Sequence, residues 1–132
     1  MENIKKEIDN ICRLIKDEVT DAYNKKNFGR IVADISEVIE RSIDADYLKG
    51  QYAGYNLLGN MNFDLCNYPE AQENFLRSLS IAEKMEDEKN ISFAQNNIGI
   101  IFFRLKEFDK ALEYYYKALE IKLKIKDEAS IS

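Results

Sequence analysis

Residues 92–132 read SFAQNNIGIIFFRLKEFDKALEYYYKALEIKLKIKDEASIS, and they repeat the pattern of residues 52–92, YAGYNLLGNMNFDLCNYPEAQENFLRSLSIAEKMEDEKNIS. When the two segments are superimposed with a shift of 40 residues, 13 of the 41 aligned positions are identical. The identical pairs include Asn56 and Asn96, Gly59 and Gly99, Phe63 and Phe103, Leu65 and Leu105, Ala71 and Ala111, and Leu79 and Leu119. Internal similarity at this period indicates that the chain is built from copies of one structural unit.

A weaker third copy precedes these two. Tyr23 aligns with Phe63, and Phe28 aligns with Tyr68. After Phe28, apolar residues recur at the spacing of one stripe of a 3.6-residue helix, at Ile31, Val32, Ile35, Val38 and Ile39. The first half of this unit has the same helical period, at Ile4, Ile8, Ile11, Ile15, Val19 and Ala22. Each unit is therefore predicted to be a pair of helices.

The turns inside the three pairs are short, and they fall at residues 25–27, 66–67 and 106–107. Turns of this length make the two helices of a pair adjacent and antiparallel. Asn27 and Asn67 are suitable N-cap residues, and Pro69 fits a first helical turn. The sequence thus predicts an all-α solenoid of three antiparallel helix pairs.

Two of the units resemble the tetratricopeptide repeat. That pattern places a Leu-Gly pair and then an aromatic residue in the first helix, and Ala followed four residues later by an aromatic in the second. The matching residues are Leu58-Gly59, Ala71 and Phe75 in the second unit, and Ile98-Gly99, Phe102, Ala111 and Tyr115 in the third. The small residues allow the two helix backbones to approach closely. The resemblance implies a right-handed superhelix that binds a protein or peptide in its concave groove.

The chain also departs from the family pattern. Its period is longer than the usual length of roughly 34 residues, so longer helices are expected. The linkers at residues 86–90 and 126–128 lack the family's closing proline. In the first unit, Val19 and Ile31 stand where the glycine and alanine are expected, which predicts a wider helix crossing. We interpret this pair as a degenerate N-terminal cap.

We expect a single domain over residues 1–132, with units at about 4–45, 47–86 and 90–126. Ile131-Ser132 repeats Ile91-Ser92, so we expect a fragment in which a fourth unit starts at about residue 131. The outer face of the last helix would then be exposed. Its apolar residues are Tyr114, Tyr116, Ile121 and Ile125, and we expect this C-terminal helix to support a homodimer.

Composition and charge argue against several classes of function. Apolar residues make up 45% of the chain and charged residues 33%, which is ordinary for a soluble globular protein. The net charge of −5, with Lys and Arg interleaved with Asp and Glu, offers no track for a nucleic-acid backbone. The N-terminal residues contain no long apolar run, so neither a signal peptide nor a membrane span is expected. We predict a cytoplasmic protein.

The residues for catalysis and metal binding are scarce. Histidine, the most frequent general base, is absent. Cys12 and Cys66 lack metal-ligand spacing, and the spacing of Asp44 and Asp46 fails the pattern of a calcium loop. We therefore predict no catalytic residue, no metal site and no cofactor.

The resemblance assigns the concave groove to the first helix of each unit. Asparagine has poor propensity for the middle of a helix, yet Asn56 and Asn96 occupy the same depth in two units, where their amides suit an extended peptide backbone. The alternative is that these residues are only exposed polar groups beside core aromatics. The expected groove residues are Lys16, Thr20, Tyr23, Asn24, Asn56, Asn60, Phe63, Asp64, Asn96, Ile100, Phe103 and Arg104.

The chaperone-binding subclass of this family clamps a carboxylate with Lys, Arg and Asn side chains. Only Lys16 matches that clamp, because Leu57, Phe93 and Asn97 stand at other clamp positions. A co-chaperone role is therefore disfavoured. The amino-acid sequence of residues 96–99 and 108–113 resembles that of repeats attached to bacterial signalling and regulatory proteins. The first hypothesis is the N-terminal sensory or scaffolding part of such a protein, and the alternative is a stand-alone structural adaptor or self-associating module.

Overall fold

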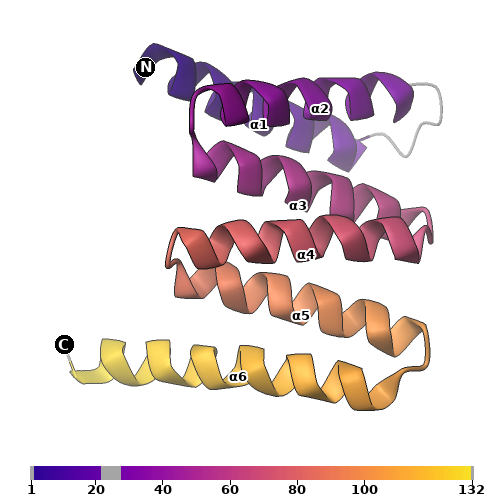
Figure 1. The fold of residues 1–132 in the computed structure, drawn as a ribbon, viewed down its shortest axis with the longest axis vertical. Helices are drawn as coiled ribbons and strands as arrows, with labels where there is room; N and C mark the ends of the chain where they lie inside the picture. Colours follow the sequence, from indigo (N-terminus) through magenta and orange to yellow (C-terminus); the bar gives the residue numbers. More distant parts are fainter. Residues whose placement is uncertain (1, 22–27, 132) are drawn as a thin grey trace.

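The computed structural model describes residues 2–21 and 28–131, and this part of the chain forms α-helices joined by short turns (Figure 1). The helices are α1 Glu2–Asp21, α2 Phe28–Asp44, α3 Leu48–Asp64, α4 Tyr68–Lys84, α5 Glu88–Arg104 and α6 Phe108–Ile131. Each packs on its neighbour in the chain, and α1 also packs on α3. Figure 1 shows α2 to α6 lying side by side in chain order, each antiparallel to the next. The prediction of an all-α solenoid of helix pairs is confirmed.

Helices α2 to α6 begin at residues 28, 48, 68, 88 and 108, so one helix and its turn together occupy 20 residues. The second residue of each described turn has positive φ: Asp46 (51°), Cys66 (62°), Glu86 (55°) and Lys106 (63°). In the turn after α4, Glu86 N–H donates to Glu83 O at 3.0 Å and Asp87 N–H donates to Ala82 O at 3.1 Å. This is the Schellman arrangement, which satisfies the last carbonyls of the helix.

The left-handed conformation at these turns is held by residues with a Cβ, although glycine is the usual occupant. Glu86→Gly is therefore expected to raise the free energy of unfolding by about 1 kcal/mol, because glycine adopts this region without the steric cost. Glu86→Ala keeps the Cβ and should change it by less than about 0.5 kcal/mol. Urea denaturation followed by circular dichroism measures both, and equal stabilities would contradict the turn geometry.

The buried core has two parts. The first joins α1, α2 and α3 through nine buried residues, which are Ile8, Cys12, Ile15, Ile31, Ile35, Val38, Ile39, Leu57 and Met61. The second joins α4 and α5 through Ala71, Phe75, Ile98 and Ile101. The stripe that the periodicity predicted for α2 is therefore the face that α2 buries. Burial of such side chains contributes about 1.5–3 kcal/mol each, so this face holds the pair together.

Glycines allow the close approach of helices at two kinds of crossing. Within the pairs, a Cβ built on Gly59 would lie 2.5 Å from the Phe75 ring, and one on Gly99 would lie 2.8 Å from the Tyr115 ring and 3.3 Å from Ala111 O. The predicted contact of Gly99 with Ala111 is confirmed. At Gly59 the nearest atoms all belong to Phe75, which lies one helical turn beyond Ala71. The aromatic ring, and not only the alanine, therefore occupies the space that glycine leaves.

The crossing between α2 and α3 uses glycines that the sequence analysis did not single out. A Cβ on Gly54 would lie 2.4 Å from Ile39 Cγ1, and a Cβ on Gly50 would overlap the Ser42 hydroxyl. Both glycines and both partners are buried. The contact between successive pairs is thus as tight as the contact within a pair at this point of the chain.

Gly59→Ala is expected to destabilise the fold by about 1–3 kcal/mol, because Phe75 is 2% exposed and its ring has little room to move. Gly29→Ala is the matched control. A methyl group there meets no atom of the described residues within 4 Å, so this change should be neutral or stabilise by up to about 1 kcal/mol. Thermal and urea denaturation of both variants measure the difference. A Gly59→Ala variant as stable as the control would contradict the crossing.

The first pair is attached to the second by polar contacts as well as by the core. The Tyr47 hydroxyl donates to Asp9 Oδ1 at 2.8 Å, and Lys49 Nζ lies 3.6 Å from Asp9 Oδ2. Burial and the hydrogen bond with Asp9 raise the pKa of Tyr47 to about 12. Ile31 is buried as predicted for a core position. The side chain of Val19 lies outside the described residues.

Two sequence-based expectations about helix ends have mixed outcomes. Asn67 is the N-cap of α4, although its side chain makes no capping hydrogen bond, and Pro69 lies in the first turn. Asn27 is outside the described residues. The linker expected at residues 126–128 is wrong, because α6 continues through it to Ile131. Residues 126–129, Lys-Asp-Glu-Ala, contain no Gly or Pro and include the helix formers Lys, Glu and Ala, so nothing in them interrupts the helix.

Candidate functional site

The predicted groove residues that the structure describes lie on three helices. Lys16 is exposed on α1. On α3, Asn60 and Asp64 are exposed, and Asn56 and Phe63 are half-buried. On α5, Phe103 and Arg104 are exposed, and Asn96 and Ile100 are half-buried. Tyr23, Asn24 and the side chain of Thr20 lie outside the described residues. The candidate site therefore lies on α3 and α5.

The residues on α3 are spaced four, seven and eight positions after Asn56, so they share one face of the helix. The residues on α5 have the same spacing from Asn96. A contact between the two helices shows that these faces adjoin: the Arg104 guanidinium lies over the Phe63 ring, 5.8 Å from its centroid. The structure thus brings residues of the second and third units to one surface.

The two aromatic residues of this surface are fixed by rings from their own pairs. Phe63 packs on Tyr68 with ring centroids 5.7 Å apart, and Phe103 packs edge-on against Phe108 at 5.4 Å. Such aromatic pairs contribute about 0.5–1.5 kcal/mol beyond their burial. Phe103 nevertheless keeps 54% of its surface exposed. It therefore remains available for contact with a partner.

The amide oxygens of Asn56, on this surface, and of Gln95, the residue before Asn96, have no hydrogen-bond partner in the described part of the chain. Both atoms, Oδ1 of Asn56 and Oε1 of Gln95, are buried. A buried acceptor without a partner costs about 1–3 kcal/mol. Sequence reasoning missed Gln95, because it aligns with Tyr55 and the repeat pattern assigns that position to a large packing residue. The only sign of this buried acceptor in the sequence is that residue 95 is a glutamine and not an apolar residue.

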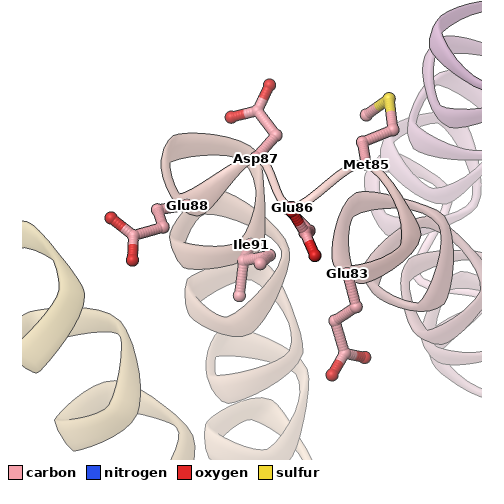
Figure 2. A pocket seen from close by; sticks show the side chains of 6 residues that line it. All are labelled: Glu83, Met85, Glu86, Asp87, Glu88 and Ile91. Carbon is pink, nitrogen blue, oxygen red and sulfur yellow. The ribbon is translucent and has the colours of Figure 1, made fainter.

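An acidic pocket of about 950 Å³ lies at the turn from α4 to α5, at the edge of the stack opposite the C-terminal ends of α3 and α5 (Figure 1). Four carboxylates line it, from Glu83, Glu86, Asp87 and Glu88, beside the apolar side chains of Met85 and Ile91. Figure 2 shows these carboxylates pointing in different directions. Two already have partners, because Asp87 accepts from Asn90 N–H at 3.1 Å and Glu88 lies 2.6 Å from Lys124 Nζ. The pocket is the space around the turn between two helices, and its carboxylates do not converge on one point where a ligand could bind.

The described part of the chain offers little for other kinds of site. Within residues 2–21 and 28–131, no group of three or more Cys, Asp or Glu side chains is arranged to hold a metal ion. No helix in the same ranges has the length and apolar character needed to cross a membrane. Cys12 is buried, where desolvation raises its thiol pKa, and Cys66 is exposed in the turn after α3.

Comparison with known proteins agrees with the geometry of the helix pairs. The family model described as tetratricopeptide repeat matches residues 51–124, which span most of α3 to α6. No curated protein and no solved structure matches the chain. The family match covers more than half of the sequence, and it includes Gly59, Gly99 and Ala111, which make the close contacts at the helix crossings, and Ala71, which is buried in the core. The chain therefore belongs to the tetratricopeptide repeat family.

Proposed function

We propose that the chain binds an extended segment of a protein partner on the face shared by α3 and α5, with Lys16 of α1 as a further candidate contact. Tetratricopeptide repeats are protein-interaction modules, which gives the general class of function. The observation that carries the finer proposal is the matched pair of faces, Asn56 to Asp64 on α3 and Asn96 to Arg104 on α5, joined by the contact of Arg104 with Phe63.

The chemistry of this face suits a peptide backbone. Asn56 and Asn96 each offer a donor and an acceptor, and two such groups in register can read successive peptide units of an extended chain. Both side chains are half-buried, so each is partly open to a partner. The Oδ1 of Asn56 is itself buried and has no partner among the described residues, so a turn of the amide toward the surface would give this acceptor a hydrogen bond. Ile100 and the exposed ring of Phe103 add apolar contact area beside these amides.

The binding face is tested by replacing Asn56 and Asn96 with alanine in one variant. Each lost hydrogen bond removes about 1 kcal/mol, so the two together should weaken binding of the native partner roughly 30-fold. Helicity by circular dichroism should be unchanged, since alanine favours helix. The partner is first captured from lysate of the source organism and identified, and affinity is then measured with the purified partner by calorimetry.

Asn74→Ala is the matched control for this experiment. Asn74 lies on α4, and its Nδ2 donates to Glu70 O at 2.9 Å. The variant therefore removes an asparagine from a helix that does not contribute to the proposed binding face. Affinity equal to wild type is expected. An Asn56→Ala, Asn96→Ala variant that binds as tightly as this control would support the alternative, in which these residues are only polar groups beside core aromatics.

We further propose a role as the N-terminal sensory or scaffolding part of a cytosolic bacterial signalling or regulatory protein. The support is the similarity of residues 96–99 and 108–113 to repeats in such proteins. The alternative is a stand-alone structural adaptor or self-associating module. The gene sequence after the codon for Ser132 distinguishes them: an effector domain in frame favours the first, and an immediate stop codon defeats it.

A further inference from the structure

An apolar stripe runs along α6 on the side turned away from α5. Its members are Leu112 (48% exposed), Tyr116 (65%), Leu119 (49%) and Leu123 (52%). Of the four residues predicted from the sequence to be exposed, Tyr114, Tyr116, Ile121 and Ile125, only Tyr116 is. The other three are half-buried on the side of α6 that faces α5, where Tyr114 stacks on Phe102 with ring centroids 5.6 Å apart.

The α4 residues 40 positions before the stripe show which of its positions are covered when a further helix follows. Ala82 is fully buried on α4, and Leu79 packs against the core cluster that α4 shares with α5. The residues 40 positions later are Lys122, which is exposed, and Leu119, which is half exposed. Leu119 therefore repeats on α6 a position that packs toward the next helix on α4, whereas Leu76 and Glu83, the counterparts of Tyr116 and Leu123, are exposed on α4 as well. In the described structure no helix covers the stripe on α6.

The spacing of the stripe selects the kind of helix that can cover it. Leu112, Tyr116, Leu119 and Leu123 are separated by four, three and four residues, which is the alternation of the a and d positions of a coiled coil. A stripe with this period packs well on a helix that has the same period. The 24 residues of α6 span about 36 Å, and Figure 1 shows its C-terminal end extending past the start of α5.

The charges beside the stripe fit a second copy of α6 in one orientation. Glu113, Glu120 and Asp127 lie along one flank, and Lys122 lies along the other. Tyr115 is on the same flank as Lys122 but packs on α5 at Gly99. In a parallel pair the two different flanks face each other, so Lys122 meets Asp127 of the partner subunit. In an antiparallel pair like flanks meet, which places Glu113 against Glu120 of the partner subunit and leaves Lys122 without an acidic partner. Lys117 lies 3.4 Å from Glu113 and offsets part of the repulsion between the two carboxylates, so the pairing of Lys122 with Asp127 of the partner subunit is what favours the parallel arrangement.

We propose that the chain forms a homodimer in which α6 packs in parallel on α6 of a second copy through Leu112, Tyr116, Leu119 and Leu123. Each copy contributes one helix, so the interface lies near the low end of specific interfaces, below about 1,200 Å² in total. The dimer is therefore expected to dissociate on dilution. This inference is independent of the face on α3 and α5.

Sedimentation velocity over a wide concentration range tests the dimer. The wild-type chain should shift from monomer to dimer as its concentration rises, and Leu119→Glu should remain monomeric, because a carboxylate cannot be buried in the seam. Leu76→Glu is the control: Leu76 is 42% exposed on α4 at the register of Tyr116, and this variant should dimerise like wild type. A wild-type chain that stays monomeric, or a Leu119→Glu variant that still dimerises, would overturn the proposal.

Disulfide trapping tests the orientation. In a Cys66→Ser background, Leu112→Cys should form a disulfide-linked dimer under mild oxidation, because a parallel pair places residue 112 beside its equivalent. Cross-linking that occurs only when Leu112→Cys and Leu123→Cys chains are mixed would overturn the parallel arrangement.

Discussion

The missing Cβ at Gly59 and Gly99 determines how closely the two helices of a pair can lie. A methyl group at either position would overlap an aromatic ring of the second helix, at 2.5 Å for Phe75 and 2.8 Å for Tyr115. Because interiors are packed at crystal-like density, the ring cannot simply withdraw when it is buried, as Phe75 is. The glycine and the ring therefore act together. They set the separation of the helices, and that separation brings the faces of α3 and α5 to one surface.

Much of the fold follows from the sequence, because its signals are local and repeated. The 40-residue self-similarity and the 3.6-residue stripes indicate helix pairs, and short turns leave only an antiparallel arrangement. The turn geometry was not predictable in the same way. Asp46, Cys66, Glu86 and Lys106 share no chemistry that marks a left-handed residue, so only the packing of the flanking helices reveals why each adopts it. The linker predicted at residues 126–128 was wrong for a similar reason. Asp127-Glu128 repeats Asp87-Glu88, which begins α5, but in α6 the same pair lies inside a continuous helix.

The sequence predicts which residues of the candidate site share a helix face, but it does not predict their side-chain contacts. Equal spacing after Asn56 and after Asn96 indicates shared faces, and the contact of Arg104 with Phe63 joins them. Sequence spacing cannot show that Phe63 and Phe103 are each held by a ring of their own pair, or that Gln95 carries a buried acceptor without a partner among the described residues. Those features depend on the angle between neighbouring helices, which arises from tertiary packing. Whether a peptide occupies this face stays a prediction.

The central claim is that glycine and ring share one volume at the crossing of α3 and α4, and a double-mutant cycle tests it most directly. Gly59→Ala and Phe75→Leu are measured alone and combined, by the free energy of unfolding in urea. If the two groups compete for the same space, the smaller leucine relieves the clash, and the combined loss should fall short of the sum of the single losses by at least about 1 kcal/mol. Losses that add within about 0.3 kcal/mol would show that Gly59 and Phe75 do not meet, and would contradict the account.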